Sequence, residues 1–551
     1  MLGLMMDRPL LISQIIEHAA EYHGDNEIVS RSVEGPIHRY TYADAARRSR
    51  QLANALKALG VVPGDRIGTL AWNGYRHFEI YFAVSGSGAI CHTLNPRLFP
   101  EQIAYIINHA DDRFIFVDLN VLAILEGLCG DLDDVQGIIV MTDRAHMPAD
   151  SVLPNLLCYE DLVAAQDEAF DWPEFDENTA ASLCYTSGTT GEPKGVLYSH
   201  RSTILHGYAV NGADAMGFTA DDTILPVVPM FHANAWGIPY AAPMVGAKLV
   251  FPGFKMDGAS LFELFESEAV TMAAGVPTVW LELLRYCEAT GERLEKLQRT
   301  LIGGSAPPRA MVERFDKEHG VRVLQGWGMT EMSPLGTITS MRRGERDLPA
   351  EAQYDLIAKQ GRPIFGVSLK MVDDAGRELP KDGLAFGNLL VQGPWVARSY
   401  FRGEGASAFT RDGWFHTGDV CTLNPNGYMT ITDRSKDVIK SGGEWISSID
   451  LENVAMGHPA VQEAAVIGIA DAKWDERPLL VVVRQPDSKV TREALLNSFE
   501  GKVAKWWIPD DVVFVDSLPH TATGKLLKTK LRADFCDYKA PGPAVRHGAG
   551  L

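Results

Sequence analysis

Residues 185–195 read Tyr-Thr-Ser-Gly-Thr-Thr-Gly-Glu-Pro-Lys-Gly and follow an apolar, strand-like run at 181–185. The stretch concentrates hydroxyl side chains, glycines and one lysine. Glycine lets a backbone approach an anion closely, and exposed N–H groups and hydroxyls can then donate to phosphate oxygens. Lys194 adds positive charge for the same ligand. The sequence therefore predicts a phosphate-binding loop that opens after a strand.

This loop differs from a Walker A loop, because that motif needs a glycine directly before its lysine and Pro193 stands there. Composition alone also leaves open a second interpretation, which is a surface turn rich in Ser, Thr and Gly.

The sequence on both sides of the loop alternates between strand-like and helix-like patterns. Strands are expected at 66–72, 89–94, 114–117, 137–141, 223–228, 271–274 and 300–303, and helices at 11–22, 78–84, 102–109 and 261–268. Thr41 and Asp44 have the spacing of a capping box, and Gly60 is placed to end the helix that follows them. Such alternation predicts parallel sheets covered by helices on both faces.

The texture changes after about residue 365, where short strands at 368–372, 389–392 and 428–432 are separated by Gly, Asp and Asn. We predict an α/β protein. A large N-terminal domain of αβ-layered sheets would span 1–433 and include a barrel-like part at about 365–433. A small mobile C-terminal α+β domain at 434–540 and a flexible tail at 541–551 would follow.

Composition excludes several classes of function. The 551 residues carry 51 Lys and Arg against 71 Asp and Glu, a net charge of −20, which disfavours nucleic-acid binding. The seven cysteines are widely spaced without a CxxC pair, so we expect reduced thiols in a cytoplasmic protein. The first residues lack a signal-peptide pattern, and the apolar stretch 237–252 is too short to span a bilayer, so no integral membrane association is expected.

The loop at 185–195 resembles the phosphate loop of the adenylate-forming superfamily, which comprises acyl-CoA synthetases, adenylation domains and beetle luciferases. Further segments similar to this family follow in the expected order, at 303–307 (GGSAP), 326–331 (GWGMTE), 414–419 (WFHTGD), 433–437 (DRSKD), 440–444 (KSGGE) and 519–525 (PHTATGK). The resemblance implies a two-step reaction. A carboxylate attacks the α-phosphorus of MgATP, and the thiol of coenzyme A then displaces AMP.

The resemblance also implies roles for individual residues. Lys525, Thr330 and Glu331 would be catalytic, with Glu331 holding Mg²⁺, a hard cation suited to a carboxylate. Trp327 would offer a flat face to adenine, and Asp419 would bind the ribose hydroxyls. The full set expected to bind ATP or AMP is Thr186, Ser187, Gly188, Thr189, Thr190, Lys194, Gly304, Ser305, Ala306, Pro307, Trp327, Gly328, Asp419 and Arg434.

The second half-reaction implies a moving C-terminal domain. Lys436 aligns with the family hinge, and Lys440, Gly442 and Gly443 resemble the segment that is presented to coenzyme A. A glycine-rich β-turn is the alternative interpretation of that segment.

The acid pocket should include His232, Asn234, Trp236 and Gly328, with a floor of Met230, Trp236, Met272 and Met329. An amino-acid substrate is disfavoured, because 232–235 carries no Asp to pair with its ammonium group. Members restricted to acetate typically have Trp at the position of Gly328, so we expect a longer acid here. The chain resembles bacterial medium-chain fatty acyl-CoA ligases and, within these, the 3-(methylthio)propanoate–CoA ligases of dimethylsulfoniopropionate breakdown.

Two rival functions remain open at this point. The chain could form an acyl-adenylate and load a carrier protein, or it could be a nucleotide sensor without turnover. The partners implied by the resemblance are a small carboxylic acid, ATP and coenzyme A. Relatives are often homodimers, and no motif here decides the oligomeric state.

Overall fold

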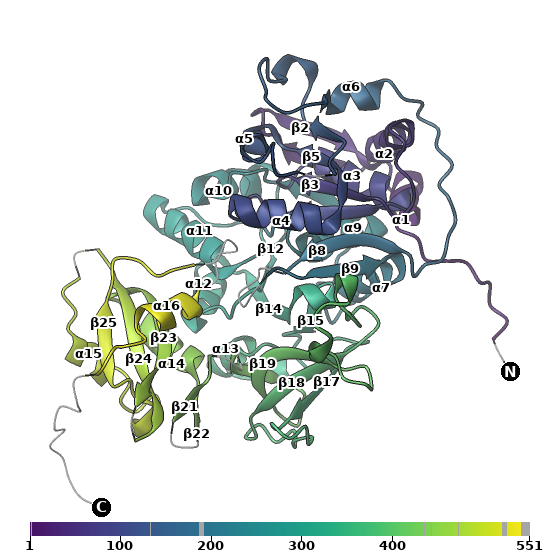
Figure 1. Ribbon diagram of the computed structural model, residues 1–551. Helices are drawn as coiled ribbons and strands as arrows, with labels where there is room; N and C mark the ends of the chain where they lie inside the picture. The colour runs from purple at the N-terminus through teal and green to yellow at the C-terminus, as the bar shows by residue number, and fades with distance from the viewer. Residues whose placement is uncertain are drawn as a thin grey trace, which may run out of the picture.

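The computed structural model describes the chain except for residues 2, 133, 187–191, 435–436, 442–443, 472, 487, 521–525 and 541–551. The described strands form four sheets, two of which are large and lie in the N-terminal part (Figure 1). A small antiparallel sheet and the C-terminal elements, green and yellow in Figure 1, lie below them.

A seven-stranded sheet has the order β7-β6-β5-β3-β4-β8-β9. Its members are β3 (Arg66–Leu70), β4 (Ile90–Leu94), β5 (Asp112–Val117), β6 (Gly137–Val140), β7 (Leu156–Cys158), β8 (Ala180–Tyr185) and β9 (Gly195–Ser199). The strands from β7 to β8 pair in parallel, as the alternating pattern predicts, whereas β8 and β9 are antiparallel. The predicted phosphate loop therefore connects two neighbouring strands of one sheet.

A nine-stranded sheet has the order β16-β15-β14-β13-β12-β10-β11-β1-β2. Its members are β1 (Glu27–Arg31), β2 (Ile37–Thr41), β10 (Thr223–Pro226), β11 (Lys248–Phe251), β12 (Met272–Gly275), β13 (Arg299–Ile302), β14 (Arg322–Gly328), β15 (Leu335–Ile338) and β16 (Arg362–Pro363). Its centre is parallel and its outer strands are antiparallel. This sheet is therefore mixed rather than wholly parallel.

Helices cover both large sheets. They are α1 (Ser13–Tyr22), α2 (Tyr42–Ala58), α3 (Tyr75–Gly86), α4 (Pro100–Ala110), α5 (Leu122–Gly127), α6 (Tyr159–Ala164), α7 (His200–Asn211), α8 (Ala233–Trp236), α9 (Ile238–Val245), α10 (Gly258–Ser267), α11 (Pro277–Thr290), α12 (Arg309–His319) and α13 (Ala350–Ile357). The capping box of Thr41 and Asp44 begins α2 as expected. Every residue of α3 is buried, because this helix packs against β1 of one sheet and against β4 and β8 of the other.

The region after 365 contains the expected antiparallel sheet. Its strands are β17 (Ser368–Val372), β18 (Gly387–Gln392), β19 (Phe415–Leu423) and β20 (Met429–Arg434), paired in that order. Among the strands that the structure describes, no pairing joins β17 to β20, so this part is an open sheet.

The C-terminal elements have the predicted α+β character. They comprise β21 (Ile439–Ser441), β22 (Glu444–Ile446), α14 (Ser448–Met456), β23 (Val461–Asp471), β24 (Asp475–Arg484), α15 (Arg492–Asn497), β25 (Asp511–Phe514) and α16 (Lys528–Asp534). They pack on β20 through short polar contacts, in which Ser448 N–H donates to Asp433 and Ser447 Oγ donates to the Thr432 carbonyl. No helix among the described residues combines the length and the apolar character that crossing a membrane requires.

Candidate active site

A cavity of about 360 Å³ lies where the predicted phosphate loop meets the carboxyl ends of β13 and β14 and the start of β19. Thr186 and Lys194 line it from the loop, and Gly304 and Trp327 line it from the nine-stranded sheet. Ligands of open α/β sheets bind beyond the carboxyl ends of the strands, which is where this cavity opens. The structure therefore brings together segments more than 100 residues apart that the sequence motifs singled out separately.

The two described ends of the loop are tied to each other. The Thr186 N–H donates to the Lys194 carbonyl at 2.9 Å, and the Lys194 N–H donates to Thr186 Oγ1 at 3.2 Å. The Lys194 ammonium lies 5.3 Å from the ring centroid of Tyr400, within cation–π range. The predicted ligands Ser187, Gly188, Thr189 and Thr190 lie outside the described residues. Thr186 and Lys194, which begin and end the loop, both line the cavity.

Glu331 is a buried carboxylate in the wall of this cavity, in the 3₁₀ turn Thr330–Met332. The Tyr400 hydroxyl donates to Glu331 Oε1 at 2.6 Å, and Tyr198 donates to the Thr330 carbonyl at 2.6 Å. Burial and the Glu331 charge raise the pKa of Tyr400, so its hydroxyl stays a donor. The sequence motifs gave no signal for Tyr400, which lies 69 residues from its partner.

Asp419 is held from two sides. The Trp327 Nε1–H donates to Asp419 Oδ2 at 2.9 Å, and Arg434 Nε lies 2.8 Å from Asp419 Oδ1. Arg434 also donates to the carbonyl of Thr417 at 3.3 Å. The Asp419 side chain is only 4% exposed, so its charge needs these partners. Three residues predicted to bind nucleotide thus form one contact network.

Of the predicted nucleotide-binding residues at 304–307, Gly304 lines this cavity. Gly304 and Ser305 line a second cavity, whereas Ala306 and Pro307 line neither. His416, Thr417 and Gly418 also line the first cavity. No role was expected for these three residues, although they belong to the segment 414–419 that resembles the family.

The apolar side of the cavity is formed by residues from several elements. These are Met216, Ala233, Trp236, Leu301, Met329, Pro334 and Leu335, with His232 beside them. The expected floor is partly wrong, because Met230 and Met272 are fully buried in the core and line neither described cavity. Asn234 is also absent from both linings. It is 2% exposed, and its Oδ1 accepts from Ser182 Oγ at 3.4 Å and from Cys184 Sγ at 3.3 Å.

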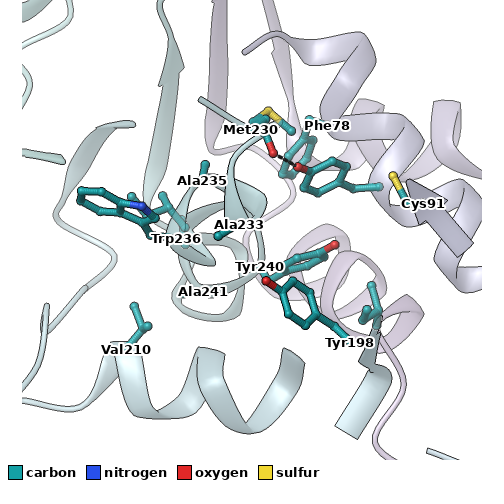
Figure 2. Packing of buried hydrophobic residues seen from close by; sticks show 14 of the residues in the cluster. Phe78, Cys91, Tyr198, Val210, Met230, Ala233, Ala235, Trp236, Tyr240 and Ala241 are labelled. Atoms are coloured by element: carbon teal, nitrogen blue, oxygen red, sulfur yellow. Dashed lines mark hydrogen bonds between the residues drawn. The ribbon is translucent and has the colours of Figure 1, made fainter. Parts of the chain in front are cut away.

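The segment that carries Trp236, labelled α8, is a left-handed turn and not a right-handed helix. Ala233, Asn234, Ala235 and Trp236 have φ values of 43°, 54°, 49° and 56°, and Gly237 follows at 80°. Left-handed helical conformation costs non-glycine residues roughly 1–2 kcal/mol each, so the turn stores on the order of several kcal/mol. Figure 2 shows the Trp236 indole pointing away from Met230 and Tyr240. Strain of this kind is maintained only when surrounding contacts fix it, and it is common at functional sites.

Gly328 lines the cavity and also has a role in the backbone. An ideal Cβ at 328 would lie 1.9 Å from the Pro334 carbonyl oxygen, so glycine is needed for a close approach of two backbone segments. The absence of a side chain therefore permits the turn between β14 and β15, as well as leaving space in the cavity.

A second cavity of about 70 Å³ shares His232 and Gly304 with the first. Its walls are mostly apolar and include Phe231, Met256, Val276 and Val279, with the cation of Arg97 at one place. Arg97 lies 5.4 Å from the ring centroid of Trp72. Three predicted site residues, His232, Gly304 and Ser305, contribute to this cavity.

The predicted residues of the C-terminal part either lie away from both cavities or are outside the described residues. Lys440 lies exposed on β21, where its N–H donates to Glu476 at 3.0 Å, and it lines neither cavity. Gly442, Gly443, the predicted hinge Lys436 and the predicted catalytic Lys525 lie outside the described residues.

Comparison with known proteins establishes the class. Residues 16–401 match the family model of the AMP-binding enzyme, and residues 450–525 match that of the AMP-binding enzyme C-terminal domain. The chain belongs to the AMP-binding enzyme family, as the resemblance of its motifs implies.

Individual relatives match over nearly their whole length. The chain is 53% identical to a 3-methylmercaptopropionyl-CoA ligase of Ruegeria lacuscaerulensis over 537 residues, which is 98% of this chain and 99% of the relative. It is 50% identical to a medium-chain-fatty-acid–CoA ligase of Ectopseudomonas oleovorans, covering 98% of each. Among solved structures, the anthranilate CoA ligase AuaEII in complex with anthranoyl-AMP matches with a TM-score of 0.84 at 25% identity. That match covers 96% of this chain and 98% of the other.

Proposed function

We propose that this chain is an ATP-dependent acid–CoA ligase. In the first step, a carboxylate oxygen bonds to the α-phosphorus of ATP, the bond to the β-phosphate breaks, and pyrophosphate leaves. In the second, the sulfur of coenzyme A bonds to the acyl carbon, the bond to AMP breaks, and the thiol proton is lost. The observation that carries this proposal is that one cavity is lined both by Thr186 and Lys194 of the predicted phosphate loop and by the apolar side chains of Trp236 and Leu335.

The first step brings two anions together, so positive charge and fixed orientation are required. Lys194 and Arg434 line the cavity of a chain whose net charge is −20. We assign the phosphates to residues 186–190 and Lys194. We assign to Lys525 the cation that bridges the carboxylate and the phosphate.

A magnesium ion fits this donor set. Among the described residues, no group of three or more His, Cys, Asp or Glu could hold a metal by itself. Magnesium usually takes one or two protein carboxylates and completes its shell with phosphate oxygens and water. We assign Glu331 as that carboxylate, beside Thr330, and the ion would neutralise phosphate charge there.

The nucleoside is assigned to the network around Asp419. Asp419 does not itself line the cavity, but its carboxylate contacts the lining residues Trp327 and Arg434 and would accept from ribose hydroxyls. Trp327 would lie against the adenine, with the Gly304–Pro307 strip on the other side. The indole N–H fixes the carboxylate in advance, so less ordering remains to be done when nucleotide binds.

The second cavity supports a route for the thiol. This small, mostly apolar cavity, which shares His232 and Gly304 with the first, suits the pantetheine arm, and Arg97 suits a phosphate of coenzyme A. We assign Lys436 as the hinge of the C-terminal domain, and Lys440, Gly442 and Gly443 as the segment that moves toward coenzyme A.

The proposed acid is 3-(methylthio)propanoate, with a medium-chain fatty acid as the alternative. The apolar wall of Met216, Trp236, Leu301 and Leu335 favours an uncharged acyl chain, and Met216 and Met329 suit a thioether. The two relatives at 53% and 50% identity are named for these two acids. We place the protein in the cytoplasm, which suits its seven free cysteines, and a homodimer remains compatible with it.

A pyrophosphate-release screen tests the proposal. Purified chain, MgATP and coenzyme A should release pyrophosphate with 3-(methylthio)propanoate, and more weakly with butanoate or hexanoate. AMP release on addition of free coenzyme A supports a ligase. Release only with a phosphopantetheinyl carrier protein would instead support carrier loading, and no release with any acid of two to twelve carbons would support a sensor.

A further inference from the structure

The left-handed turn Ala233–Trp236 separates the core from the apolar side of the first cavity. Ala233 and Trp236 line that cavity, whereas Asn234 and Ala235, between them, face the core. The four residues share one backbone conformation, which only glycine, Asn and Asp adopt readily. Backbone bonds from the Ala235 N–H to the His232 carbonyl and from the Gly237 N–H to the Asn234 carbonyl, at 3.1 and 3.0 Å, close the turn. Its position relative to β8 depends on side-chain contacts.

Asn234 supplies such a contact. Its Oδ1 lies 3.4 Å from Ser182 Oγ and 3.3 Å from Cys184 Sγ, and both partners belong to β8. Strand β8 ends at Tyr185, where the predicted phosphate loop begins. The carboxamide thus ties the turn to the strand from which that loop starts.

The turn is also fixed from its N-terminal side. The buried amide of Asn73 donates to the carbonyls of Pro226 and Val228, at 2.8 and 3.0 Å, and accepts from the Met230 N–H at 2.6 Å. Tyr81 donates to the Met230 carbonyl, the dashed bond in Figure 2. These bonds act on Met230, ahead of the turn. Within the turn, Asn234 is the residue whose side chain forms hydrogen bonds to β8.

The position of Trp236 depends on the turn. A Cβ at Gly303 would lie 2.9 Å from the Trp236 indole, so the ring packs directly against the end of β13. A small rotation of the turn would move this ring relative to Gly303 and change the depth of the apolar side of the cavity. Ala235 makes no such polar contact through its methyl side chain, although it shares the conformation.

We propose that Asn234 is a positioning residue for acid selection, which holds Trp236 in place by tying the left-handed turn to β8. This inference rests on the proposed function, because it concerns the acid side of the same cavity. Asn234 itself would not touch the acid.

Two neighbouring glycine substitutions separate the side-chain contact from the backbone conformation. Both Asn234→Gly and Ala235→Gly place glycine in a left-handed position, where it is favoured, but only the first removes the bonds to Ser182 and Cys184. Each variant and the wild type would be assayed for kcat/KM with 3-(methylthio)propanoate and straight-chain acids, for the KM of ATP, and for Tm.

We expect Asn234→Gly to fold and to change the ratio of kcat/KM between short and medium acids by about tenfold, the scale of one methylene in an apolar pocket. The KM of ATP should stay within about twofold, which is under 0.5 kcal/mol. Ala235→Gly should keep the wild-type ranking and an equal or higher Tm. An unchanged ranking in Asn234→Gly, or the same change in both variants, would overturn the inference.

The double variant Ser182→Ala/Cys184→Ala removes the partners and leaves Asn234 in place. It should shift the acid ranking in the same direction as Asn234→Gly, and a wild-type ranking would again count against the inference. A wild-type enzyme that activates no acid would refute the proposed function itself. That result differs from an unchanged acid ranking in either variant.

Discussion

The indole N–H of Trp327 on β14 donates a 2.9 Å hydrogen bond to Asp419 on β19, across 92 residues of sequence. Removing it with Trp327→Phe leaves the carboxylate with Arg434 alone. A hydrogen bond to a charged group is worth about 1.5–3 kcal/mol, so we expect the KM of ATP to rise about tenfold or more without a change in acid ranking. Trp414→Phe, in a tryptophan that lines neither cavity, is the matched control. An unchanged ATP KM in Trp327→Phe would contradict this role.

The Tyr400 hydroxyl orients Glu331, so Tyr400→Phe should weaken the site proposed for magnesium. We expect kcat to fall about tenfold and the half-saturating Mg²⁺ concentration to rise, because the carboxylate loses a charge-assisted donor. Tyr354→Phe removes a similar bond, at 2.5 Å to Asp316, on a surface helix. It should leave both quantities unchanged. Equal effects in the two variants would show that tyrosine loss acts only through stability.

Gly328→Ala tests the close approach of two backbone segments. A methyl group 1.9 Å from the Pro334 carbonyl forces the chain to move, and overpacking of this kind costs typically 1–3 kcal/mol or more. We expect a lower Tm and loss of activity with every acid. Gly127→Ala is the control, because nothing lies within 4 Å of its added Cβ. A Gly328→Ala enzyme with wild-type Tm that merely prefers shorter acids would favour the simpler pocket-size interpretation.

His206 contributes to the pH dependence of stability. It is buried and its Nε2 accepts from the Leu335 N–H at 3.1 Å, and burial lowers the pKa of the imidazole from 6.5 to about 3. Between these two values the unfolded chain binds a proton that the folded chain does not. His206 therefore makes the protein less stable as pH falls below 6.5, by about 1.4 kcal/mol per pH unit.

His206→Gln should flatten the pH dependence of the unfolding free energy by about one proton between pH 4 and 6. Urea titrations at several pH values measure this slope. Asp118 affects the pH dependence of stability in the opposite direction. Burial raises its pKa to about 7, so the stability that its protonated form contributes is lost as pH rises. Comparing the slopes of the variant and the wild type separates the effect of His206 from that of other groups. Identical slopes would contradict a neutral, buried His206 in the folded protein.

Lys525 is proposed to join carboxylate and phosphate during adenylation. Lys525→Ala should slow acyl-adenylate formation by about 10² to 10³ or more, since one preorganised contact to the transition state is worth about 2.7–4 kcal/mol. ATP binding should remain measurable by calorimetry. Lys530→Ala removes a nearby lysine that pairs with Asp534 on α16 and should behave as wild type. Normal adenylation by Lys525→Ala would refute the assignment.

Local sequence signals predicted much of the fold. The capping box at Thr41 begins α2, and strands such as β17 at Ser368–Val372 fall where the alternating pattern placed them. These features depend on neighbouring residues, which is why sequence alone specifies them. The mixed pairing of β14, β15 and β16 depends on long-range contacts and was not foreseen.

The site was predicted less completely. Motifs located Lys194, Glu331 and Asp419, because contiguous segments carry them. The partners Tyr400 and Tyr198 have no local signal, since only the folded chain brings them to the 3₁₀ turn at Thr330.

The left-handed turn could not be anticipated either. Ala233, Ala235 and Trp236 disfavour that conformation, and only Asn234 and Gly237 hint at it. Met230 and Met272 were assigned to the pocket by their type, and burial in the core overrode that assignment.

The most direct test is a crystal structure of the protein with the adenylate of 3-(methylthio)propanoate, or with a sulfamate mimic of it. We expect the adenosine between Trp327 and Asp419, the phosphate near Thr186 and Lys194, and the thioether chain toward Trp236. A ligand bound elsewhere, with the 186–194 segment free of it, would contradict the assignment of this cavity as the place where acid and AMP are joined.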